Sequence, residues 1–347
     1  MLIARSVHPL PGEAERKERL LALVDNFSSR RVVVVGDIVA DEFIYGEVAR
    51  VSREAPVLIL KYDATEMVAG GAGNAVNNVA ALGGRARLAG VAGADAEGSR
   101  LLRSFQRGVD RAFVIRSRDY RTPVKTRILA GGVHSAKQQV VRIDRETDWP
   151  IDASLARSLS KAVLPALDDC DAVILSDYGS GLVTPALVRR LRAAVNAESP
   201  SVPILLDTRH RLLDYRGLTA CTPNESEVEQ ALGIRINDNL KVLEKAGREL
   251  LDRTRMRAVL ITRGSRGMAL FVKDAPTLHI PIYGSDEIAD VTGAGDTVMA
   301  TMALALGAGA TFELAARLAN YAGGLVVMKR GTATVSAKEL SAAVRRG

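Results

Sequence analysis

The sequence predicts an α/β protein in which a mostly parallel central sheet carries helices on both faces, giving three layers. Four short apolar runs, 32–35, 171–175, 203–206 and 258–261, are rich in Val, Ile and Leu. Such runs are typical of strands that are buried on both faces. Helical patterns separate them at 72–82, 155–167, 185–195 and 240–251. Strands that alternate with helices in this way favour a parallel sheet over any all-α or all-β arrangement.

Each apolar run ends in a polar group. The groups are Asp37, Ser176 with Asp177, Asp207 and Thr262. In open parallel sheets, ligands bind beyond the carboxyl ends of the strands. We therefore expect the functional site at that edge.

Two stretches break the alternation, 43–62 and 113–143. They lack helical periodicity and are rich in Val, Ile, Thr, Arg and Tyr, with a turn signal at 131–132. We expect strands of a small antiparallel element inserted into the main domain. It could be a lid or a dimer surface, or an ordinary surface hairpin. Residues 1–30 are expected to form a helical extension, and 31–347 one domain.

Composition excludes several classes. The 347 residues carry a net charge of +7, but the basic residues are spread along the chain among acidic ones, and only 4% of residues are aromatic. This argues against nucleic acid and favours small anionic ligands. No apolar stretch reaches ~18 residues and no signal peptide is evident, so we expect a cytoplasmic protein without a membrane segment. The two cysteines, Cys170 and Cys221, indicate neither a disulfide nor a zinc site.

The segment Asp290-Val-Thr-Gly-Ala-Gly-Asp-Thr297 precedes an apolar run, 298–306, that reads as a buried helix. Free amides at a helix N-terminus favour anions, so Gly293, Ala294 and Gly295 could surround a phosphate. Asp296 would then take a proton from the group that attacks it. The alternative is a Gly-rich turn with an acidic residue that only stabilises the helix dipole.

A second Gly-rich segment lies at 70–74. The chain has no Gly-Lys pair and hence no P-loop, and the segment lacks the spacing of a dinucleotide-binding turn. Gly70 and Gly71 would let the backbone approach a ligand, and the Asn74 amide can bind sugar hydroxyls. The alternative for Asn74 is helix capping.

Together these motifs resemble the ribokinase-like (PfkB-type) carbohydrate kinases, from residue 32 to residue 336. Gly70-Gly71 with Asn74 matches the family's N-terminal signature, and 290–296 matches its C-terminal signature. Between them, Thr222-Pro-Asn224-Glu-Ser-Glu227 is similar to the family's magnesium motif, and Thr262-Arg-Gly264-Ser-Arg-Gly267 to its nucleotide turn. The resemblance implies the ribokinase-like fold and ATP-dependent phosphorylation of a sugar.

Within the family, the resemblance is strongest to kinases that convert heptose 7-phosphate to heptose 1,7-bisphosphate. The segments at 36–41, 50–56, 175–178, 214–217 and 331–336 carry it. The chain departs from these kinases at Arg53, where proline is usual, and at Thr208-Arg209-His210, where Pro-Lys-Gly is usual. The alternatives are a kinase for another sugar, such as ribose or fructose phosphate, and a catalytically silent sugar or nucleotide sensor.

The resemblance assigns roles to the remaining residues. Asp296 is the general base and 293–295 the anion hole. Mg²⁺ lies near Asn224 and Glu227, largely through water, although these two also read as a helix start with a capping box. Thr262, Gly264 and Gly267 lie near the phosphates or ribose. The helix around Asn320 and the loop before residue 290 form the adenine pocket.

For the acceptor, Asp37 and Asp41 would accept hydrogen bonds from sugar hydroxyls, with Gly71 and Asn74 beside them. Asp37 is preferred because it ends a strand, whereas Asp41 could be an exposed lid residue. The cations that could bind an acceptor phosphate are Lys125, Arg127, Arg142 and Arg209, each of which could also be a surface charge. Arg209 comes first because it takes the place of the family's lysine.

Asp290 and Thr292 are the candidates for a monovalent cation, K⁺, or else for loop structure alone. The partners expected for the chain are a sugar or sugar phosphate, ATP, and a second copy of the chain bound through the lid strands.

Overall fold

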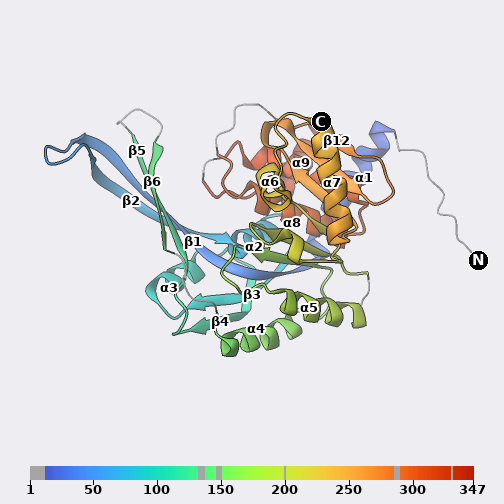
Figure 1. Ribbon diagram of the computed structural model, residues 1–347, viewed down its shortest axis with the longest axis horizontal. Coiled ribbons are helices and arrows are strands. Elements are labelled where there is room, and N and C mark those ends of the chain that lie inside the picture. The colour runs from blue at the N-terminus through green and yellow to red at the C-terminus, as the bar shows by residue number, and fades with distance from the viewer. Residues whose placement is uncertain (1–11, 132–136, 146–150, 199–200, 285–289, 330) are drawn as a thin grey trace, which may run out of the picture.

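The computed structural model describes residues 12–131, 137–145, 151–198, 201–284, 290–329 and 331–347. It has the expected α/β class, with helices on both faces of a mostly parallel sheet (Figure 1). The strand order is β12-β11-β10-β9-β8-β7-β1-β3-β4. Neighbours from β10 to β4 are parallel, and β11 and β12 are antiparallel.

The strands of the main sheet include all four expected apolar runs. They are β1 (Arg31–Val51), β3 (Arg85–Gly93), β4 (Val109–Ser117), β7 (Ala172–Asp177), β8 (Ile204–Thr208), β9 (Ala220–Cys221), β10 (Ala258–Thr262), β11 (Met268–Val272) and β12 (Leu278–Ile280).

Two hydrophobic cores lie on opposite faces of this sheet. Because side chains alternate along a strand, Val32 and Val34 enter one core, while Val33 and Val35 enter the other. The first core packs against α1 (Glu13–Asp25), α2 (Ala72–Ala81), α3 (Ala96–Arg103), α8 (Ala294–Gly307), α9 (Phe312–Val326) and α10 (Ala337–Arg346). The second packs against α4 (Ala153–Ala166), α5 (Pro185–Glu198), α6 (Glu225–Leu232) and α7 (Leu240–Thr254).

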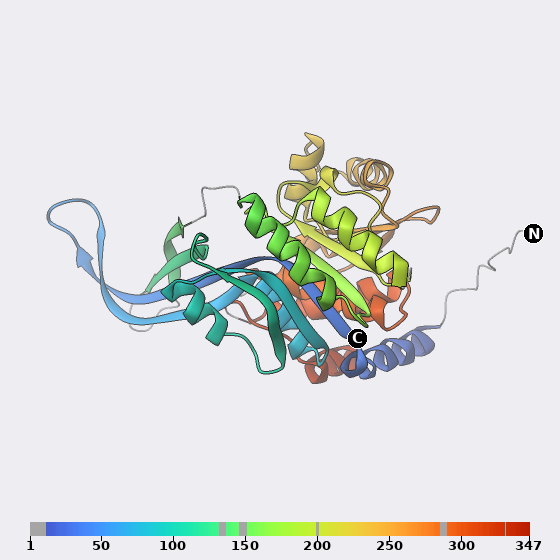
Figure 2. The same cartoon turned by 90° about the horizontal axis from the view of Figure 1, so that it is seen from below.

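An arm extends from one side of the sheet (Figures 1 and 2). Strand β1 pairs with β3 and β7 as far as residue 37, then continues outward between β2 (Leu58–Gly71) and β5 (Val124–Gly131). Strand β6 (Gln138–Arg145) pairs with β5. We call these outer strands, 38–71, 124–131 and 138–145, the lid.

The lid differs from the expected ranges, 43–62 and 113–143, at both segments: the first pair of strands is longer, 38–71, and the second begins at residue 124. Residues 113–117 lie in β4 at the edge of the main sheet, where they pair with β3, and are not part of the lid. Their alternating pattern fits either location, because an edge strand and a lid strand are both half-buried. Residues 132–136 lie outside the described part.

Helix α1 provides the described part of the N-terminal extension. It packs against α10 and α9 through Leu20 and Val24. Residues 1–11 are outside the described part. Among the described residues, no helix is long and apolar enough to cross a membrane.

Candidate active site

Helix α8 begins at the expected anion site. Its N-cap is Gly293, whose φ of 77° is readily adopted only by glycine. The N–H of Ala294 donates to Val291 O at 3.2 Å, so it is already satisfied. Within the described residues, the N–H groups of Gly293 and Gly295 donate no backbone hydrogen bond. The expected three open amides are therefore reduced to two in this structure.

Asp296, in the first turn of α8, is 4% exposed. Its Oδ2 accepts from Asn74 Nδ2 at 2.7 Å and its Oδ1 from the Tyr178 hydroxyl at 3.2 Å. An acidic residue that only stabilises a helix dipole would face solvent, so the plain helix-start alternative does not describe it. Burial, and next the negative charge of Asp207, raise the pKa of Asp296 well above its ordinary value. Burial also raises the pKa of Tyr178, so the hydroxyl keeps its proton and donates.

Asn74 is not a helix cap. The N-cap of α2 is Gly71, without a side-chain cap, and Asn74 is the third residue of the helix. It is 1% exposed and bonds to a residue 222 positions away. The contact between α2 and α8 therefore brings the two Gly-rich motifs together.

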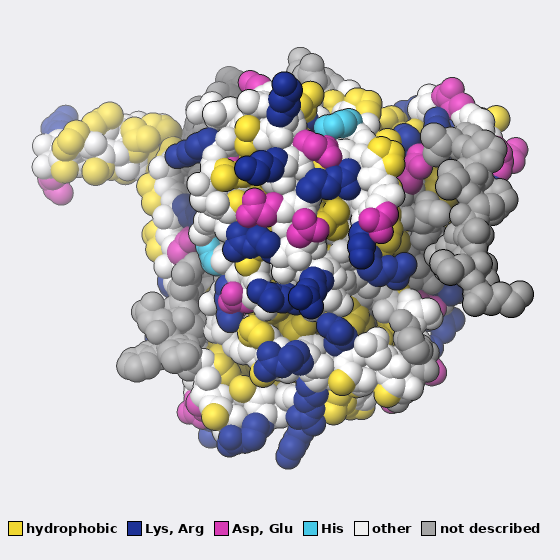
Figure 3. Space-filling view, turned by 45° about the vertical axis from the view of Figure 1, so that its right-hand side comes forward, with side chains coloured by type: hydrophobic (Ala, Val, Ile, Leu, Met, Phe, Trp, Pro, Cys, Tyr) yellow, Lys and Arg dark blue, Asp and Glu magenta, His cyan; other side chains and the backbone are white. Residues whose placement is uncertain are grey.

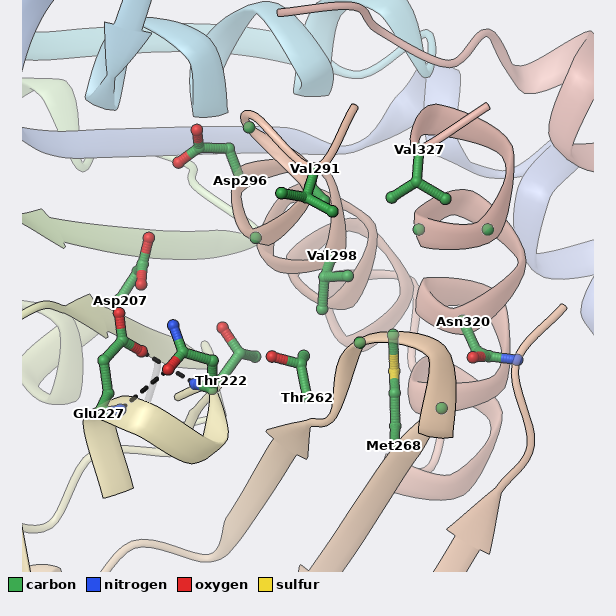
Figure 4. Close-up of a pocket in the computed structure, with 18 of the residues that line it drawn as sticks. Asp207, Thr222, Glu227, Thr262, Met268, Val291, Asp296, Val298, Asn320 and Val327 are labelled. Atoms are coloured by element: carbon green, nitrogen blue, oxygen red, sulfur yellow. Dashed lines mark hydrogen bonds between the residues drawn. The ribbon is translucent and has the colours of Figure 1, made fainter. Parts of the chain in front are cut away.

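A cavity of about 420 Å³ opens beside Asp296. The ends of β8, β9 and β10, the start of α6 and the facing sides of α8 and α9 form its walls (Figure 4). Its lining includes these candidates: Arg209, Asn224, Glu227, Thr262, Gly264, Gly267, Gly293, Ala294, Gly295, Asp296 and Asn320. The polar strand ends Asp207 and Thr262 are among the lining residues, in agreement with the site expected from the strand pattern.

The polar wall of this cavity holds two carboxylates, Asp207 and Glu227 (Figure 4). Asn224 and Glu227 form a capping box on α6, with both bonds at 2.9 Å. The capping alternative is thus correct, and the same side chains also line the cavity. Burial, and next the charge of Asp207, raise the pKa of Glu227 to about 7. Two neighbouring carboxylates whose negative charges are unfavourable together make this wall attractive to a cation.

The opposite wall is mainly apolar. It consists of Met268, Ile282, Val298 and Val327 with the paired glycines of α9, Gly323 and Gly324. A Cβ added at Gly324 would come within 2.1 Å of Tyr283 O, so only glycine fits there. Asn320 lines this end and donates to Pro281 O at 2.9 Å. The expected contribution of the loop before residue 290 falls on 285–289, outside the described residues.

Asp290 is held by the backbone. Its carboxylate accepts from Thr292 N at 2.8 Å and from Gly331 N at 3.0 Å. Loop structure therefore accounts for this residue, and each oxygen keeps a lone pair that a cation could use.

The two acceptor-site aspartates differ from expectation. Asp37 is fully buried and accepts from Tyr178 N at 2.7 Å, from Ser180 N at 3.2 Å and from the Ser180 hydroxyl. It fixes the loop after β7. Asp41 is 7% exposed, so it is not the exposed lid residue that was considered. Strand β1 runs on past Asp37 and carries Asp41 to the underside of the lid, beside Gly70.

Four cations gather around Asp41 and Tyr178, and we call Lys125, Arg127, Arg142 and Arg209 the cationic cluster. Arg127 Nη1 lies 2.5 Å from Asp41 Oδ1. The Tyr178 ring lies 4.4 Å from the Arg209 guanidinium and 5.8 Å from Lys125 Nζ. Arg142 binds Asp144, and the charges of Arg209 and Asp41 both act on its pKa. Besides Asp41 and Asp144, the carboxylates of Asp207 and Asp296 also act on Arg209, so the cluster gathers four cations beside the candidate base.

On the face shown in Figure 3, Lys and Arg side chains are mixed with acidic ones in the upper half and outnumber them in the lower half. The projecting arm in that view carries hydrophobic side chains. Among the exposed ones are Val51, Val57, Leu58 and Tyr62.

Sequence analysis assigned no individual binding or catalytic role to several residues that lie at this site: Tyr178, Asp207, Thr222, Gly323 and Gly324. Asp207 had a detectable signal, since it ends an apolar strand. The glycine pair inside an otherwise helical pattern was a second signal, because glycine in a helix costs about 1 kcal/mol relative to alanine. Nothing in the local sequence distinguishes Tyr178 from a surface tyrosine.

Comparison with known proteins agrees with this geometry. The profile of the family described as pfkB family carbohydrate kinase matches residues 29–339. Two relatives named bifunctional protein HldE are each 41% identical. That of Geobacter metallireducens matches over 310 residues, covering 89% of this chain and 61% of the relative. That of Caulobacter vibrioides matches over 320 residues, covering 91% and 64%. The chain thus spans about two thirds or less of these relatives.

Solved structures share the fold. Phosphofructokinase-2 of Escherichia coli, in complex with substrates and products, has a TM-score of 0.73 at 18% identity and covers 91% of this chain and 99% of its own. Ribokinase of Arabidopsis thaliana, in complex with ribose and ATP, has a TM-score of 0.68 at 20% identity, with the same coverage. The expected ribokinase-like fold is confirmed.

Proposed function

Because the chain belongs to the pfkB family of carbohydrate kinases, we propose that it transfers the γ-phosphoryl group of ATP to a hydroxyl of a sugar phosphate. Heptose 7-phosphate is the acceptor that the proposal names, with heptose 1,7-bisphosphate as product. Identity of 41% to proteins named HldE supports a heptose. The observation that supports a phosphorylated acceptor is the cationic cluster next to Asp296, the proposed base.

Asp296 takes the proton of the attacking hydroxyl. Its raised pKa makes it a stronger proton acceptor than an ordinary aspartate, and such bases contribute about 10²–10⁴ in rate. The hydroxyl attacks in line, and the γ-phosphoryl group passes to it while ADP leaves. The amides of Gly293 and Gly295 stabilise the charge on that group, each worth roughly 10²–10³. Base and amides belong to one helix start, which fixes their separation.

ATP fits the cavity because one side of the cavity is apolar and the other carries polar side chains. The adenine lies against Gly323 and Gly324, which line the apolar wall without side chains. Thr262, Gly264 and Gly267 lie along the middle, near the ribose and phosphates.

Mg²⁺ would be held near Asn224 and Glu227 through water, and its role is to neutralise phosphate charge. The donor set fits, since Asp207 adds a second carboxylate. Thr222 Oγ1 is also buried there without a hydrogen-bond partner among the described residues. K⁺ would bind at Asp290 and Thr292, where backbone donors leave lone pairs on the carboxylate.

The acceptor lies between the lid and Asp296. Asp41 accepts hydrogen bonds from its hydroxyls, and Gly70 and Gly71 let it approach the backbone. Asp37 positions the 178–180 loop. The phosphate of the acceptor is bound by the cationic cluster, since guanidinium and ammonium groups pair with phosphate.

The decisive experiment measures ADP release with Mg²⁺·ATP and a panel of acceptors: heptose 7-phosphate, the same heptose without phosphate, ribose and fructose 6-phosphate. We expect the highest kcat/KM with heptose 7-phosphate. A preference for ribose or fructose 6-phosphate would select the alternative sugar kinase. No turnover with any acceptor would leave the silent sensor.

Charge removal tests the phosphate site separately. Arg209→Gln and Lys125→Gln should raise KM for phosphorylated acceptors by roughly tenfold, the effect of a lost charge-assisted hydrogen bond, with little change for unphosphorylated ones. Arg145→Gln is the matched control, because Arg145 lies on the lid but binds Glu42 at 3.1 Å. If all three variants changed KM alike, the cluster would not be the phosphate site.

The exposed apolar side chains of the lid support a homodimer formed through these strands. Hydrophobic surface that projects on an arm is typical of an interaction site.

A further inference from the structure

A chain of hydrogen bonds leads from inside α8 back to Asp296 through α2. Thr297 Oγ1 donates to Asn78 Oδ1 at 2.8 Å. Asn78 Nδ2 donates to Asn74 Oδ1 at 3.1 Å, and Asn74 Nδ2 donates to Asp296 Oδ2 at 2.7 Å. None of the four side chains is more than 4% exposed. Water therefore cannot replace any of these bonds without rearrangement.

Every bond in this hydrogen-bond chain points the same way, and two main-chain carbonyls favour that direction. Asn78 Nδ2 also lies 3.0 Å from Asn74 O, and Asn74 Nδ2 lies 3.4 Å from Gly293 O. A carbonyl oxygen only accepts, so in each case the amide nitrogen must face it. The contact of Asn74 with Gly293 O is long, so the orientation of Asn74 also depends on the Asn78 amide that donates to its Oδ1.

The direction matters because Asn74 could otherwise present either of two groups to Asp296. With its N–H toward Asp296, it stabilises a carboxylate. Turned over, its oxygen would face Asp296 Oδ2, and only a protonated carboxyl could donate to that oxygen. A carboxyl that donates in this way cannot take a proton from a substrate.

We propose that Asn78 and Thr297 are positioning residues, which fix the direction of this hydrogen-bond chain so that Asn74 always presents an N–H and keeps Asp296 a proton acceptor. The proposal rests on the proposed kinase function and extends it to two residues that do not reach the substrate. Asn78 acts directly on Asn74 Oδ1. Thr297 acts one step further away, by satisfying Asn78 Oδ1.

Other charged and titratable groups also face Asp296. Tyr178, after β7, donates to it; Asp207, on β8, opposes its ionisation; and Arg209, after β8, favours it. None of them contacts Asn78 or Thr297 by a hydrogen bond among the described residues, so they act equally in the variants below.

The test compares two substitutions with matched controls. Asn78→Leu removes the donor to Asn74. Asn77→Leu is its control, because Asn77 is on the same helix and, among the described residues, its Oδ1 accepts from Gln106 N, which is not part of the hydrogen-bond chain. Thr297→Val removes the hydroxyl with little change of shape. Thr301→Val is its control, because Thr301 is equally buried in α8 but donates to Thr297 O.

For Asn78→Leu we expect kcat at pH 7 to fall by roughly tenfold or more with KM for ATP unchanged, and the acidic limb of the pH profile to move up by about one unit. Turnover should recover at higher pH. Thr297→Val should shift the limb in the same direction but less, because Asn74 O still holds Asn78. The two controls should leave the limb in place. Equal effects in variants and controls would overturn the proposal.

A second readout does not depend on turnover. The titration of Asp296 is followed by the ¹³C signal of labelled aspartate carboxyls, assigned by its loss in Asp296→Asn. The midpoint should rise in Asn78→Leu and Thr297→Val; an unchanged midpoint would overturn the proposal whatever the activity. Absence of turnover in the wild type would remove only the proposed kinase function. If Asn78→Leu fails to fold, the nearly isosteric Thr297→Val carries the test.

Discussion

Replacement of Asp296 by asparagine should separate catalysis from stability. The variant keeps the shape of the side chain, and its Oδ1 can still accept from Asn74 Nδ2, now 2.7 Å from the carboxylate. It loses the base. Because a general base contributes about 10²–10⁴, we expect kcat to fall by that factor while ATP still binds.

The same change should make the protein more stable at neutral pH. The folded-state pKa of Asp296 is raised, so the folded protein keeps a proton that the unfolded chain releases above about 3.9. Stability from this group is therefore complete below that pH and is lost as pH rises toward the folded-state pKa. Each pH unit in this range changes the stability by about 1.4 kcal/mol. Between pH 5 and pH 7 the wild type therefore loses about 3 kcal/mol relative to the variant.

Urea unfolding of both proteins at pH 5 and pH 7 measures this difference, and ADP release at saturating ATP measures turnover. The stability advantage of Asp296→Asn should grow between the two pH values. Turnover within a factor of ten of wild type would refute the general-base role. A variant that is less stable by the same amount at both pH values would refute the argument that Asp296 is costly to ionise where it lies.

Three further predictions follow from the same geometry. Tyr178→Phe removes the 3.2 Å hydrogen bond to Asp296. It should lower kcat by roughly tenfold, as expected for a hydrogen bond to a charged group. An unchanged kcat in steady-state assays would show that Asn74 alone positions the base. Glu227→Gln keeps an oxygen that can cap α6 but removes the charge. The Mg²⁺ concentration for half-maximal rate should therefore rise with no loss of thermal stability. A drop in melting temperature without a change in Mg²⁺ dependence would assign Glu227 to capping alone. Val51→Asp combined with Leu58→Asp places charge at side chains that are 59% and 48% exposed. Light scattering should then show a monomer, with an unchanged melting temperature. A wild type that is already monomeric at micromolar concentration would contradict the lid dimer.

Local sequence patterns were sufficient to predict much of the fold and part of the candidate site. Apolar runs located β7, β8 and β10 within a residue or two, because a strand buried on both faces has few alternatives to a continuous apolar stretch. The turn at 293–295 and its helix were equally evident, since a glycine with positive φ and a buried helix start are both local requirements. The resemblance of four ordered motifs then indicated the family, which the comparisons confirmed.

Those patterns could not decide which of Asp37 and Asp41 is the better candidate for binding the acceptor hydroxyls. Both are acids near the end of an apolar run, and local sequence does not reveal that β1 leaves the main sheet and continues into the lid. That course depends on pairing with β2 and β5, which are distant in the chain. It buries Asp41 beside Arg127 and leaves Asp37 to bind the 178–180 loop.

Local sequence was sufficient to predict the α/β class, the position of the Gly-rich helix start and Asp296 as a candidate base. Periodicity and turn chemistry are properties of neighbouring residues, so they can be read without a fold. The contacts of Asp296 depend on the folded chain, because Asn74 is 222 residues away and Tyr178 is 118 away. The packing of α2 against α8 and the parallel order of β1, β7 and β8 bring these groups together, and no local pattern encodes that packing.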